Sequence, residues 1–250
     1  VEEGGASFYT WNLQRRLGED WLQKWEDLTA RRLDAWGLTT IGNWSHIPQT
    51  PNKPYVSVVQ QWQRTAPYLG LPDVYSDAFA RDMDAAAAQE CTPRRQDPFL
   101  LGYFIGNEPP WPGREHDVVD MILSGPATGT RREAERFLAK GDTPERRVAF
   151  VHQAFRDSLE VINAAIQKYD PHHLNLGLRF GRNPGEGIIR MASVFDVYSL
   201  NVYAYEPTAQ LELAHRLTGR PVLIGEFHIG VPGNGLGAGL VQARDQGERG

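Results

Sequence analysis

The stretch Phe99-Leu-Leu-Gly-Tyr-Phe-Ile-Gly-Asn-Glu108 decides the fold class. It begins with a nearly continuous apolar run, which is the pattern of a β-strand covered on both faces. Strands of this kind belong to parallel sheets, in which helices join one strand to the next. The run ends at a glycine, an asparagine and the acid Glu108, so polar groups stand where the strand stops.

The rest of the chain alternates short apolar runs with amphipathic helical stretches. Helices are predicted over residues 20–36, 77–89, 144–169 and 209–217. The third has Thr143 as its cap, Pro144 at its first position and apolar residues at steps of three and four. Further strands are predicted over residues 38–41, 55–59, 174–178, 194–200 and 221–224. Residues 108–142, rich in Pro, Gly and Arg, are predicted to form an elaborated loop.

Each predicted strand carries a polar or aromatic cluster at its C-terminal end. That arrangement fits a (β/α)₈ barrel and an open doubly wound sheet alike, because both bind ligands beyond the carboxyl ends of their strands. A closed barrel needs two strands more than the sequence offers. We therefore expect a single α/β catalytic domain over residues 1–250, and a barrel that lacks its first and last strands and is truncated at both ends.

The composition excludes several classes of protein. The 250 residues are 41% hydrophobic and 23% charged, as in ordinary globular domains. A net charge of −5 argues against a nucleic-acid partner, which calls for a basic stripe. No apolar run approaches the roughly 20 residues that span a bilayer, so no membrane partner is expected. The single cysteine, Cys91, excludes an internal disulfide and a thiolate zinc cluster. The oligomeric state stays open.

Two acids, Glu108 and Glu226, each follow an apolar strand and a glycine, so both should stand at the mouth of a strand. Hydrolysis of a glycosidic bond with retention needs two carboxyl groups about 5–5.5 Å apart across a sugar. One protonates the leaving oxygen and later activates water, while the other attacks the anomeric carbon. The alternative is that each acid caps the next helix or pairs with a nearby arginine. The two together favour catalysis.

Several motifs resemble known families. Asn107-Glu108-Pro109, Asn201-Val-Tyr203 and Gly225-Glu226 at successive strand ends resemble the clan A retaining glycosidases. Within that clan, further stretches resemble the exo-acting β-agarase family. They are Phe8-Tyr-Thr-Trp-Asn-Leu13, Trp36-Gly-Leu-Thr-Thr-Ile-Gly-Asn-Trp-Ser45, Leu71-Pro-Asp-Val-Tyr75, Gly102-Tyr-Phe-Ile-Gly-Asn-Glu108 and Gly225-Glu-Phe-His-Ile-Gly230.

The resemblance implies a (β/α)₈ barrel with Glu108 as the acid/base and Glu226 as the nucleophile. It implies that Asn107 hydrogen-bonds the sugar 2-OH and that Tyr203 supports the nucleophile. The implied substrate is a polysaccharide or oligosaccharide with β-glycosidic bonds, an agarose-like galactan being favoured, and the chemistry calls for no metal or other cofactor. The resemblance also implies a secreted or periplasmic protein, although the chain shows no signal peptide.

Other polar and aromatic residues near strand ends are candidates for binding sugar. Aromatic rings give sugars an apolar face, so two tryptophans are candidate platforms, with packing as the alternative. Two asparagines can bond hydroxyls or merely close turns, a histidine can bind sugar or be structural, and an arginine can tune the nucleophile, anchor substrate or form a plain salt bridge. These residues are Trp44, Trp111, Asn43, Asn201, His228 and Arg179.

Two other functions remain open at this point. One is a non-catalytic carbohydrate-binding relative with the same cleft, and the other is a clan A β-galactosidase or β-mannanase. Gly233-Asn-Gly-Leu-Gly-Ala238 formally fits a dinucleotide fingerprint, but no acidic strand end follows it, and we interpret it as an active-site loop. Glu115-His116-Asp117 and His172-His173 lack the spacing of a metal site and are interpreted as solvated residues.

Overall fold

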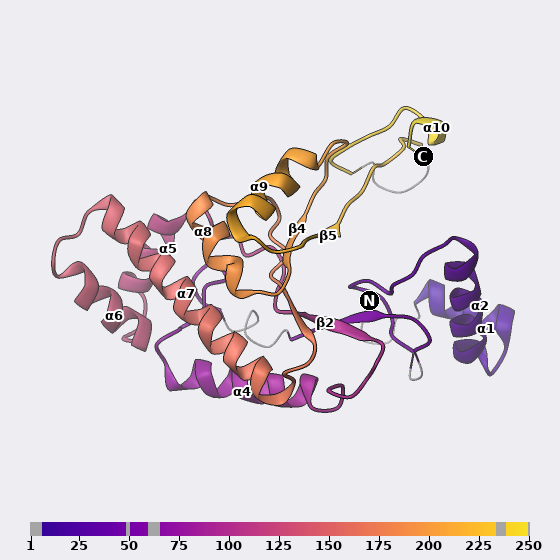
Figure 1. Ribbon diagram of the computed structural model, residues 1–250, viewed down its shortest axis with the longest axis horizontal. Helices are drawn as coiled ribbons and strands as arrows, with labels where there is room; N and C mark the ends of the chain where they lie inside the picture. The colour runs from indigo at the N-terminus through magenta and orange to yellow at the C-terminus, as the bar shows by residue number, and fades with distance from the viewer. Residues whose placement is uncertain (1–6, 49–50, 60–65, 234–238, 250) are drawn as a thin grey trace. The chain divides into compact units, whose positions relative to one another are not determined.

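The computed structural model describes residues 7–48, 51–59, 66–233 and 239–249 (Figure 1). The chain forms two compact units, Val1–Tyr55 and Val56–Gly250. Each is described by itself below. That residues 1–250 act as a single catalytic domain stays a prediction.

The first unit contains two helices, α1 (Phe8–Leu17) and α2 (Trp21–Ala35). The Oγ atom of Ser7 accepts the Thr10 N–H and caps α1, which the sequence analysis missed. The indole N–H of Trp25 donates to the Tyr9 hydroxyl at 2.9 Å and ties the two helices together. The strand predicted over 38–41 is wrong: its last residue forms only an isolated bridge to Tyr55. The N–H of that residue donates to the carbonyl of Pro54, and a proline has no N–H with which to extend the ladder.

The second unit is built around parallel strands. Strands β1 (Tyr55–Val58), β2 (Leu100–Phe104) and β3 (Leu174–Gly177) form one sheet in that order. Strands β4 (Tyr198–Asn201) and β5 (Val222–Glu226) form a second, and both β2–β3 and β4–β5 are parallel. A parallel bridge between Phe180 and Leu200 joins the sheets, so the strands follow one another in chain order.

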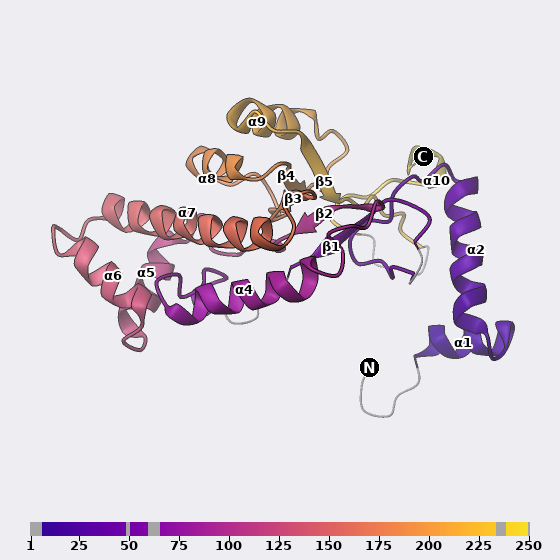
Figure 2. The ribbon, with the colours of Figure 1, turned by 60° about the horizontal axis from the view of Figure 1, so that its bottom comes forward.

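Helices connect these strands and lie along one side of them, in the same order as the strands (Figure 2). They include α4 (Asp77–Cys91), α7 (Pro144–Tyr169), α8 (Glu186–Met191) and α9 (Thr208–Thr218), with a 3₁₀ turn at Ala192–Val194. A short α10 (Gln246–Arg249) follows the last strand and connects none. The regular alternation of strand and helix confirms the α/β class. Closure of the strands into a barrel stays a prediction.

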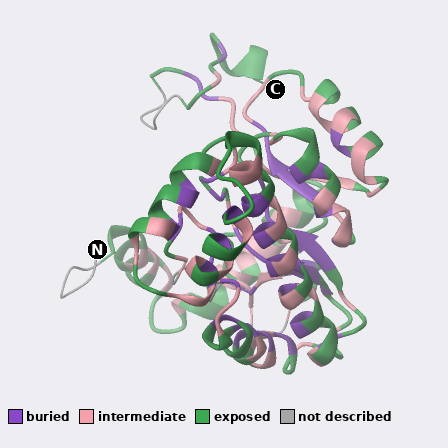
Figure 3. Ribbon diagram, turned by 90° about the vertical axis from the view of Figure 1, so that its left-hand side faces the viewer, coloured by how far each residue is buried: buried purple, intermediate pink, exposed green. Residues whose placement is uncertain are grey.

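Helix α7 shows why this segment folds as predicted. The Thr143 side chain accepts the Arg146 N–H, and Pro144 occupies the first turn, where a missing N–H costs nothing. Its apolar stripe, from Phe150 to Ile166, is buried, and the helix packs against α4. A smaller buried cluster of Val56, Phe104 and Leu176 comes from the three strands of the first sheet, and Val197 and Leu223 pack against it. Figure 3 shows the buried residues concentrated in the strands and on the inward faces of the helices.

The predicted loop over residues 108–142 is wrong in its middle, which forms α5 (Glu115–Ser124) and α6 (Gly129–Leu138). Helix α5 buries Val118, Val119 and Ile122, and α6 begins at Thr128, whose side chain accepts an N–H of the first turn. Proline and glycine separate the helices and concealed their short apolar stripes in the sequence. Both helices pack on α7, away from the strand ends.

Candidate active site

The carboxyl ends of β2, β3, β4 and β5 meet along one edge of the second unit. Backbone hydrogen bonds continue between neighbouring segments past the strand ends. They join Glu108 N to Arg179 O at 3.0 Å, Asn201 N to Phe180 O at 2.7 Å, and Val202 N to Glu226 O at 2.9 Å. The two acids, although far apart in sequence, are therefore held in one continuous network of neighbouring strand ends.

Two of these strand ends turn through a backbone conformation that L-residues rarely adopt. Glu108 has a φ of 45° and Arg179 a φ of 48°, both in the left-handed region. Such a conformation in a non-glycine residue costs about 1–3 kcal/mol and persists only where the surroundings enforce it. The Glu108 N–H to Arg179 carbonyl bond joins the two strained residues directly. Strain of this kind concentrates at functional sites, which singles out this pair.

Glu226 is held by a cation and a phenol. The Tyr203 hydroxyl donates to Glu226 Oε2 at 2.8 Å, and Arg179 Nη1 lies 3.4 Å from Oε1. The hydrogen bond to Glu226, together with burial and the nearby negative charges, raises the pKa of Tyr203 to about 12. The phenol therefore keeps its proton at neutral pH and acts as a donor to the carboxylate.

Arg179 is fully buried, and its guanidinium stacks over the Phe104 ring at 4.9 Å. Burial lowers the pKa of this arginine, while the charges of Glu226 and Glu108 act in the opposite direction. A buried cation needs compensating anions, and these two carboxylates supply them. A Cβ on Gly225 would lie 2.6 Å from Arg179 Cδ, so only glycine leaves room for the arginine beside β5.

Glu108 is surrounded by different groups. The Asn201 amide donates to Glu108 Oε1 at 2.7 Å and to Asn107 Oδ1 at 3.2 Å. Asn201 is itself buried, whereas Glu108 is exposed. A Cβ on Gly181 would come within 3.2 Å of the Glu108 carboxyl carbon, so a glycine there keeps that side open. The partner of this acid is a neutral amide whose position is fixed by the fold.

A pocket of about 510 Å³ opens on the Glu108 side of the site. Its walls come from the segment after β2, which includes Pro109, Pro110 and Pro112, and from residues 180–185 after β3. This pocket was not predicted from the sequence. Its signal was the run Gly181-Arg-Asn-Pro-Gly185, a cluster of turn residues directly after a strand and next to a candidate site residue.

The structure brings six of the predicted site residues together: Asn107, Glu108, Arg179, Asn201, Tyr203 and Glu226. The prediction that Trp111 is a platform for sugar is wrong. It is 1% exposed and packs its ring against Phe155 at a centroid distance of 4.9 Å, because the segment after Pro110 turns inward onto α7. It is a core residue and has no free face for a sugar.

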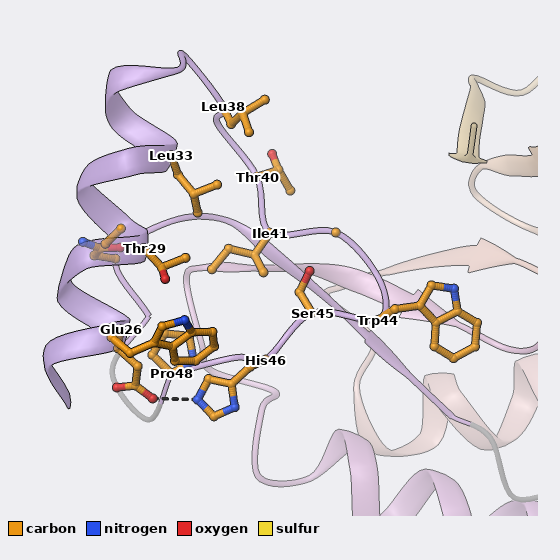
Figure 4. A pocket seen from close by; sticks show the side chains of 14 residues that line it. Glu26, Thr29, Leu33, Leu38, Thr40, Ile41, Trp44, Ser45, His46 and Pro48 are labelled. Carbon is orange, nitrogen blue, oxygen red and sulfur yellow. Dashed lines mark hydrogen bonds and ion pairs between the residues drawn. The ribbon is translucent and has the colours of Figure 1, made fainter. Parts of the chain in front are cut away.

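The other three predicted residues lie elsewhere. His228 follows β5, and Gly239 passes so close to its imidazole that only a glycine fits there. Asn43 and Trp44 belong to the first unit, where Trp44 borders a pocket of about 570 Å³ between α2 and the segment that follows it (Figure 4). Glu26 Oε1 and His46 Nε2, which both line that pocket, are hydrogen-bonded at 2.6 Å. That Asn43, Trp44 and His228 bind the substrate stays a prediction.

The remaining candidate residues are engaged in structure. His173 Nδ1 lies 2.7 Å from Asp170 Oδ2, and Tyr103 donates to the same oxygen at 2.7 Å. Burial raises the pKa of the Cys91 thiol to about 12, so at neutral pH it is not a nucleophile. Among the residues that the structure describes, no three His, Cys, Asp or Glu side chains gather as metal ligands would. Residues 234–238 of the glycine-rich run lie outside the described residues.

The fold and the paired strand-end acids are features of glycoside hydrolases that act through two carboxyl groups. No protein-family profile matches the chain. Beta-agarase B of Vibrio sp. (strain JT0107) is 27% identical to this chain over an alignment of 301 positions. The alignment covers 97% of this chain and 31% of that protein. The chain spans about a third of the length of the curated relatives that it matches.

Solved structures agree. The crystal structure of an agarase, AgWH50C, superposes with a TM-score of 0.80 and 28% identity, covering 97% of this chain and 42% of the agarase. An exo-beta-agarase shares the fold, with a TM-score of 0.81 and 24% identity over 97% of this chain and 40% of its own. These comparisons confirm the resemblance to exo-β-agarase-like glycoside hydrolases that the motifs indicated. None of the helices in the described parts of the chain is long and apolar enough to cross a bilayer.

Proposed function

We propose that this chain carries the catalytic centre of a retaining glycoside hydrolase that cleaves β-glycosidic bonds in an agarose-like galactan. The observation that carries the proposal is the pair of strand-end carboxylates with opposite surroundings. Glu226 faces a buried cation and a phenol, whereas Glu108 faces a neutral amide and an open pocket. Two carboxyl groups in different environments are what an acid and a nucleophile require. The similarity to β-agarases supports the choice of substrate.

In the first step, a carboxylate oxygen of Glu226 attacks the anomeric carbon, and Glu108 gives its proton to the glycosidic oxygen. The bond between that carbon and oxygen breaks, and the leaving sugar departs as an alcohol. Asn201 fixes which oxygen of Glu108 acts as the acid. Its N–H₂ group can only donate, and it occupies Oε1, so the transferred proton sits on Oε2.

In the second step, Glu108 takes a proton from a water molecule as the water attacks the anomeric carbon from the face that the leaving group vacated. The bond to Glu226 breaks and its carboxylate is regenerated. Each displacement inverts the carbon, so the product keeps the β configuration. The same residue serves as acid and then as base, as microscopic reversibility requires.

Three neighbours support these roles. Arg179 lies against one oxygen of Glu226 and offsets the negative charge that the acid pair would otherwise concentrate. The Tyr203 hydroxyl holds the other carboxylate oxygen and orients the attacking one. Asn107 accepts a hydrogen bond from Asn201 beside Glu108, and the resemblance assigns it to the sugar 2-OH.

The order of the parallel strands supports a (β/α)₈ barrel of clan A type as the architecture of the whole domain. An agarose-like polysaccharide is too large to enter a cell intact, which supports action of the enzyme outside the cell or in the periplasm. A β-galactosidase, a β-mannanase and a non-catalytic carbohydrate-binding protein are outcomes that the test below distinguishes from the proposal.

The test combines product analysis with chemical rescue. The chain should release β-configured products from agaro-oligosaccharides, measured by ¹H NMR before mutarotation. Glu226→Ala and Glu108→Ala should each lower turnover of an aryl β-galactoside by about 10⁴-fold or more. Azide should rescue the first as an α-galactosyl azide and the second as a β-galactosyl azide. Glu186→Ala, at an exposed pair on α8, is the control and should be fully active.

Each contrary result has a distinct meaning. Full activity in either site variant would overturn the assignment of the acids. Initial α products would overturn retention. Hydrolysis of other β-linked glycans but not of agaro-oligosaccharides would overturn the substrate. Saturable binding of oligosaccharide without any hydrolysis would identify a binding protein instead.

A further inference from the structure

The pocket beside Glu108 lies on one particular side of the proposed reaction centre. Glu108 forms part of its wall, whereas Glu226 and Tyr203 do not border it. In a double displacement the acid stands at the oxygen of the leaving group, and the nucleophile stands on the opposite face of the reacting sugar. A pocket that is bordered by the acid and not by the nucleophile therefore lies where the leaving group departs.

The walls of this pocket suit an uncharged sugar ring. Pro110, Pro112 and Pro184, which are exposed or half-buried, offer rigid apolar surface against which the C–H faces of a pyranose can pack. Glycines at 113, 181 and 185 keep the floor and rim free of side chains. The volume of about 510 Å³ lies within the roughly 300–1,000 Å³ usual for small-molecule sites.

One cation, Arg182, also lines the pocket, and its side chain is exposed. Its neighbour Asn183 is committed to structure, because its amide donates to the Gln210 carbonyl at 2.8 Å and accepts from the Tyr198 hydroxyl at 3.2 Å. These bonds fix the segment after β3 to β4 and α9 and so hold Arg182 at the rim. The guanidinium offers several donors in a plane, which suits pairs of sugar hydroxyl or ring oxygens.

We infer that this pocket is the subsite for the leaving saccharide, with Arg182 as the residue that recognises its oxygens. The ligand class is a neutral galactan oligosaccharide on the reducing-end side of the cleaved bond. The same subsite binds an acceptor sugar when the glycosyl intermediate on Glu226 is intercepted by a carbohydrate in place of water. The inference rests on the proposed function. It adds that the reducing-end part of the substrate lies on the Glu108 side of the site.

Substrates that differ only in their leaving group test the inference. A β-galactosyl fluoride loses fluoride and places no sugar in the pocket, whereas an agaro-oligosaccharide fills it. Arg182→Ala should lower kcat/KM for the oligosaccharide by about tenfold or more, and leave hydrolysis of the fluoride within about twofold. Arg190→Ala is the matched control, because Arg190 is an exposed arginine on α8 that does not line the pocket.

A second variant fills the pocket. A Cβ on Gly185 meets nothing within 4 Å, and the residue has a φ of −55°, so Gly185→Phe adds a ring at the rim without backbone strain. It should slow oligosaccharide cleavage and abolish saturable reactivation, by added galactose disaccharide, of enzyme trapped with a 2-deoxy-2-fluorogalactosyl group. The fluoride reaction should again be spared.

The outcomes separate the two proposals. Equal losses on both substrates, or no loss on either, would overturn the subsite while the hydrolase assignment stands. If the unaltered chain cleaves neither substrate, the hydrolase assignment fails, and calorimetric titration with the oligosaccharide decides the pocket by itself. Binding that Gly185→Phe removes would then support the site, and binding that is unchanged by both variants would overturn it.

Discussion

The two sides of the candidate site hold their carboxylates in opposite ways. Glu226 is gripped at both oxygens, by Arg179 and by Tyr203, and is largely shielded from solvent. Glu108 is exposed, is held at one oxygen by Asn201 and faces a pocket with the other side. A nucleophile has to be charged and immobile at the moment of attack, whereas an acid/base has to exchange its proton with a leaving group and with water. The difference in anchoring matches that division of labour.

Among substitutions of the residues that support the two acids, removal of the Arg179 charge beside Glu226 should have the largest effect. Arg179→Met removes the buried charge while keeping an unbranched side chain over the Phe104 ring. We expect kcat for an agaro-oligosaccharide to fall by about 10²–10³-fold, as when a preorganised charged donor is lost. Arg179→Lys, which keeps the charge but not the planar fork, should recover part of this loss. Equal activity of the two variants would show that charge is not what Arg179 contributes.

A smaller loss should follow from removing the phenol on the same side. Tyr203→Phe deletes one hydrogen bond to a carboxylate, and kcat should drop by about 10–100-fold with little change in KM. Tyr205→Phe is the matched control, since its hydroxyl donates to the Gln242 carbonyl and not to an acid. A rise in KM alone would make Tyr203 a substrate-binding residue rather than a positioning one.

Loss of the Asn201 amide beside Glu108 should slow only substrates whose leaving group needs a proton. Asn201→Ala frees Glu108 Oε1, so the acid loses its fixed orientation. Cleavage of oligosaccharides, whose leaving sugar needs a proton, should slow by about tenfold, the worth of one charge-assisted hydrogen bond. The kcat/KM for a 2,4-dinitrophenyl glycoside, which reports the first step alone and whose leaving group needs no proton, should be nearly normal. A uniform loss on both substrates would contradict the positioning role.

A third carboxylate, Asp170, sharpens the comparison because it is buried and hydrogen-bonded at both oxygens. Burial raises the pKa of Asp170, but hydrogen bonds from Tyr103, from His173 and from two backbone N–H groups outweigh it and leave the pKa below its usual value. A carboxylate with a depressed pKa stabilises the fold at neutral pH, and this contribution is lost as the pH falls through and below about 4.

Asp170→Asn should therefore lower the free energy of unfolding at pH 7 by about 1–3 kcal/mol, and the difference from the unaltered chain should shrink towards pH 3. Urea unfolding across that pH range measures it, while activity per folded molecule should not change. Asp82→Asn, at an exposed pair on α4, should have no effect on stability. A difference that grows as the pH falls would reverse the sign and refute this account.

The features that sequence predicted well are local ones. Helix α7 was predicted with its observed bounds because Thr143, Pro144 and a regular apolar stripe lie next to one another in the chain. Both acids were found because an apolar run, a glycine or Gly-Asn step and an acid are also contiguous. Parallel strands then bring their carboxyl ends together, so the meeting of the two acids at one edge followed from a general rule.

The features that were missed depend on contacts between distant segments. Trp111 is buried because it packs on Phe155, and no strand forms over 38–41 because its last residue pairs with Pro54, which has no N–H to donate. The hydrogen bonds from the Asn201 amide to Glu108 and Asn107 were not predicted, and that Asn201 also bonds sugar hydroxyls stays a prediction. No periodicity or motif records such pairings, because neither partner has an unusual local sequence.

The independence of the two anchors has a practical consequence. Asn201 and the Arg179 carbonyl, which hold Glu108, make no use of the Glu226 carboxylate. Excising that carboxylate, as in Glu226→Gly, would leave the acid/base assembled beside an acceptor pocket but unable to hydrolyse anything. Supplied with an α-galactosyl fluoride, such a chain would join sugars instead of separating them, and the bond it made would survive. Under the proposed mechanism, the separate hydrogen bonds that hold the two acids would make this fold a starting point for building galactans as well as for degrading them.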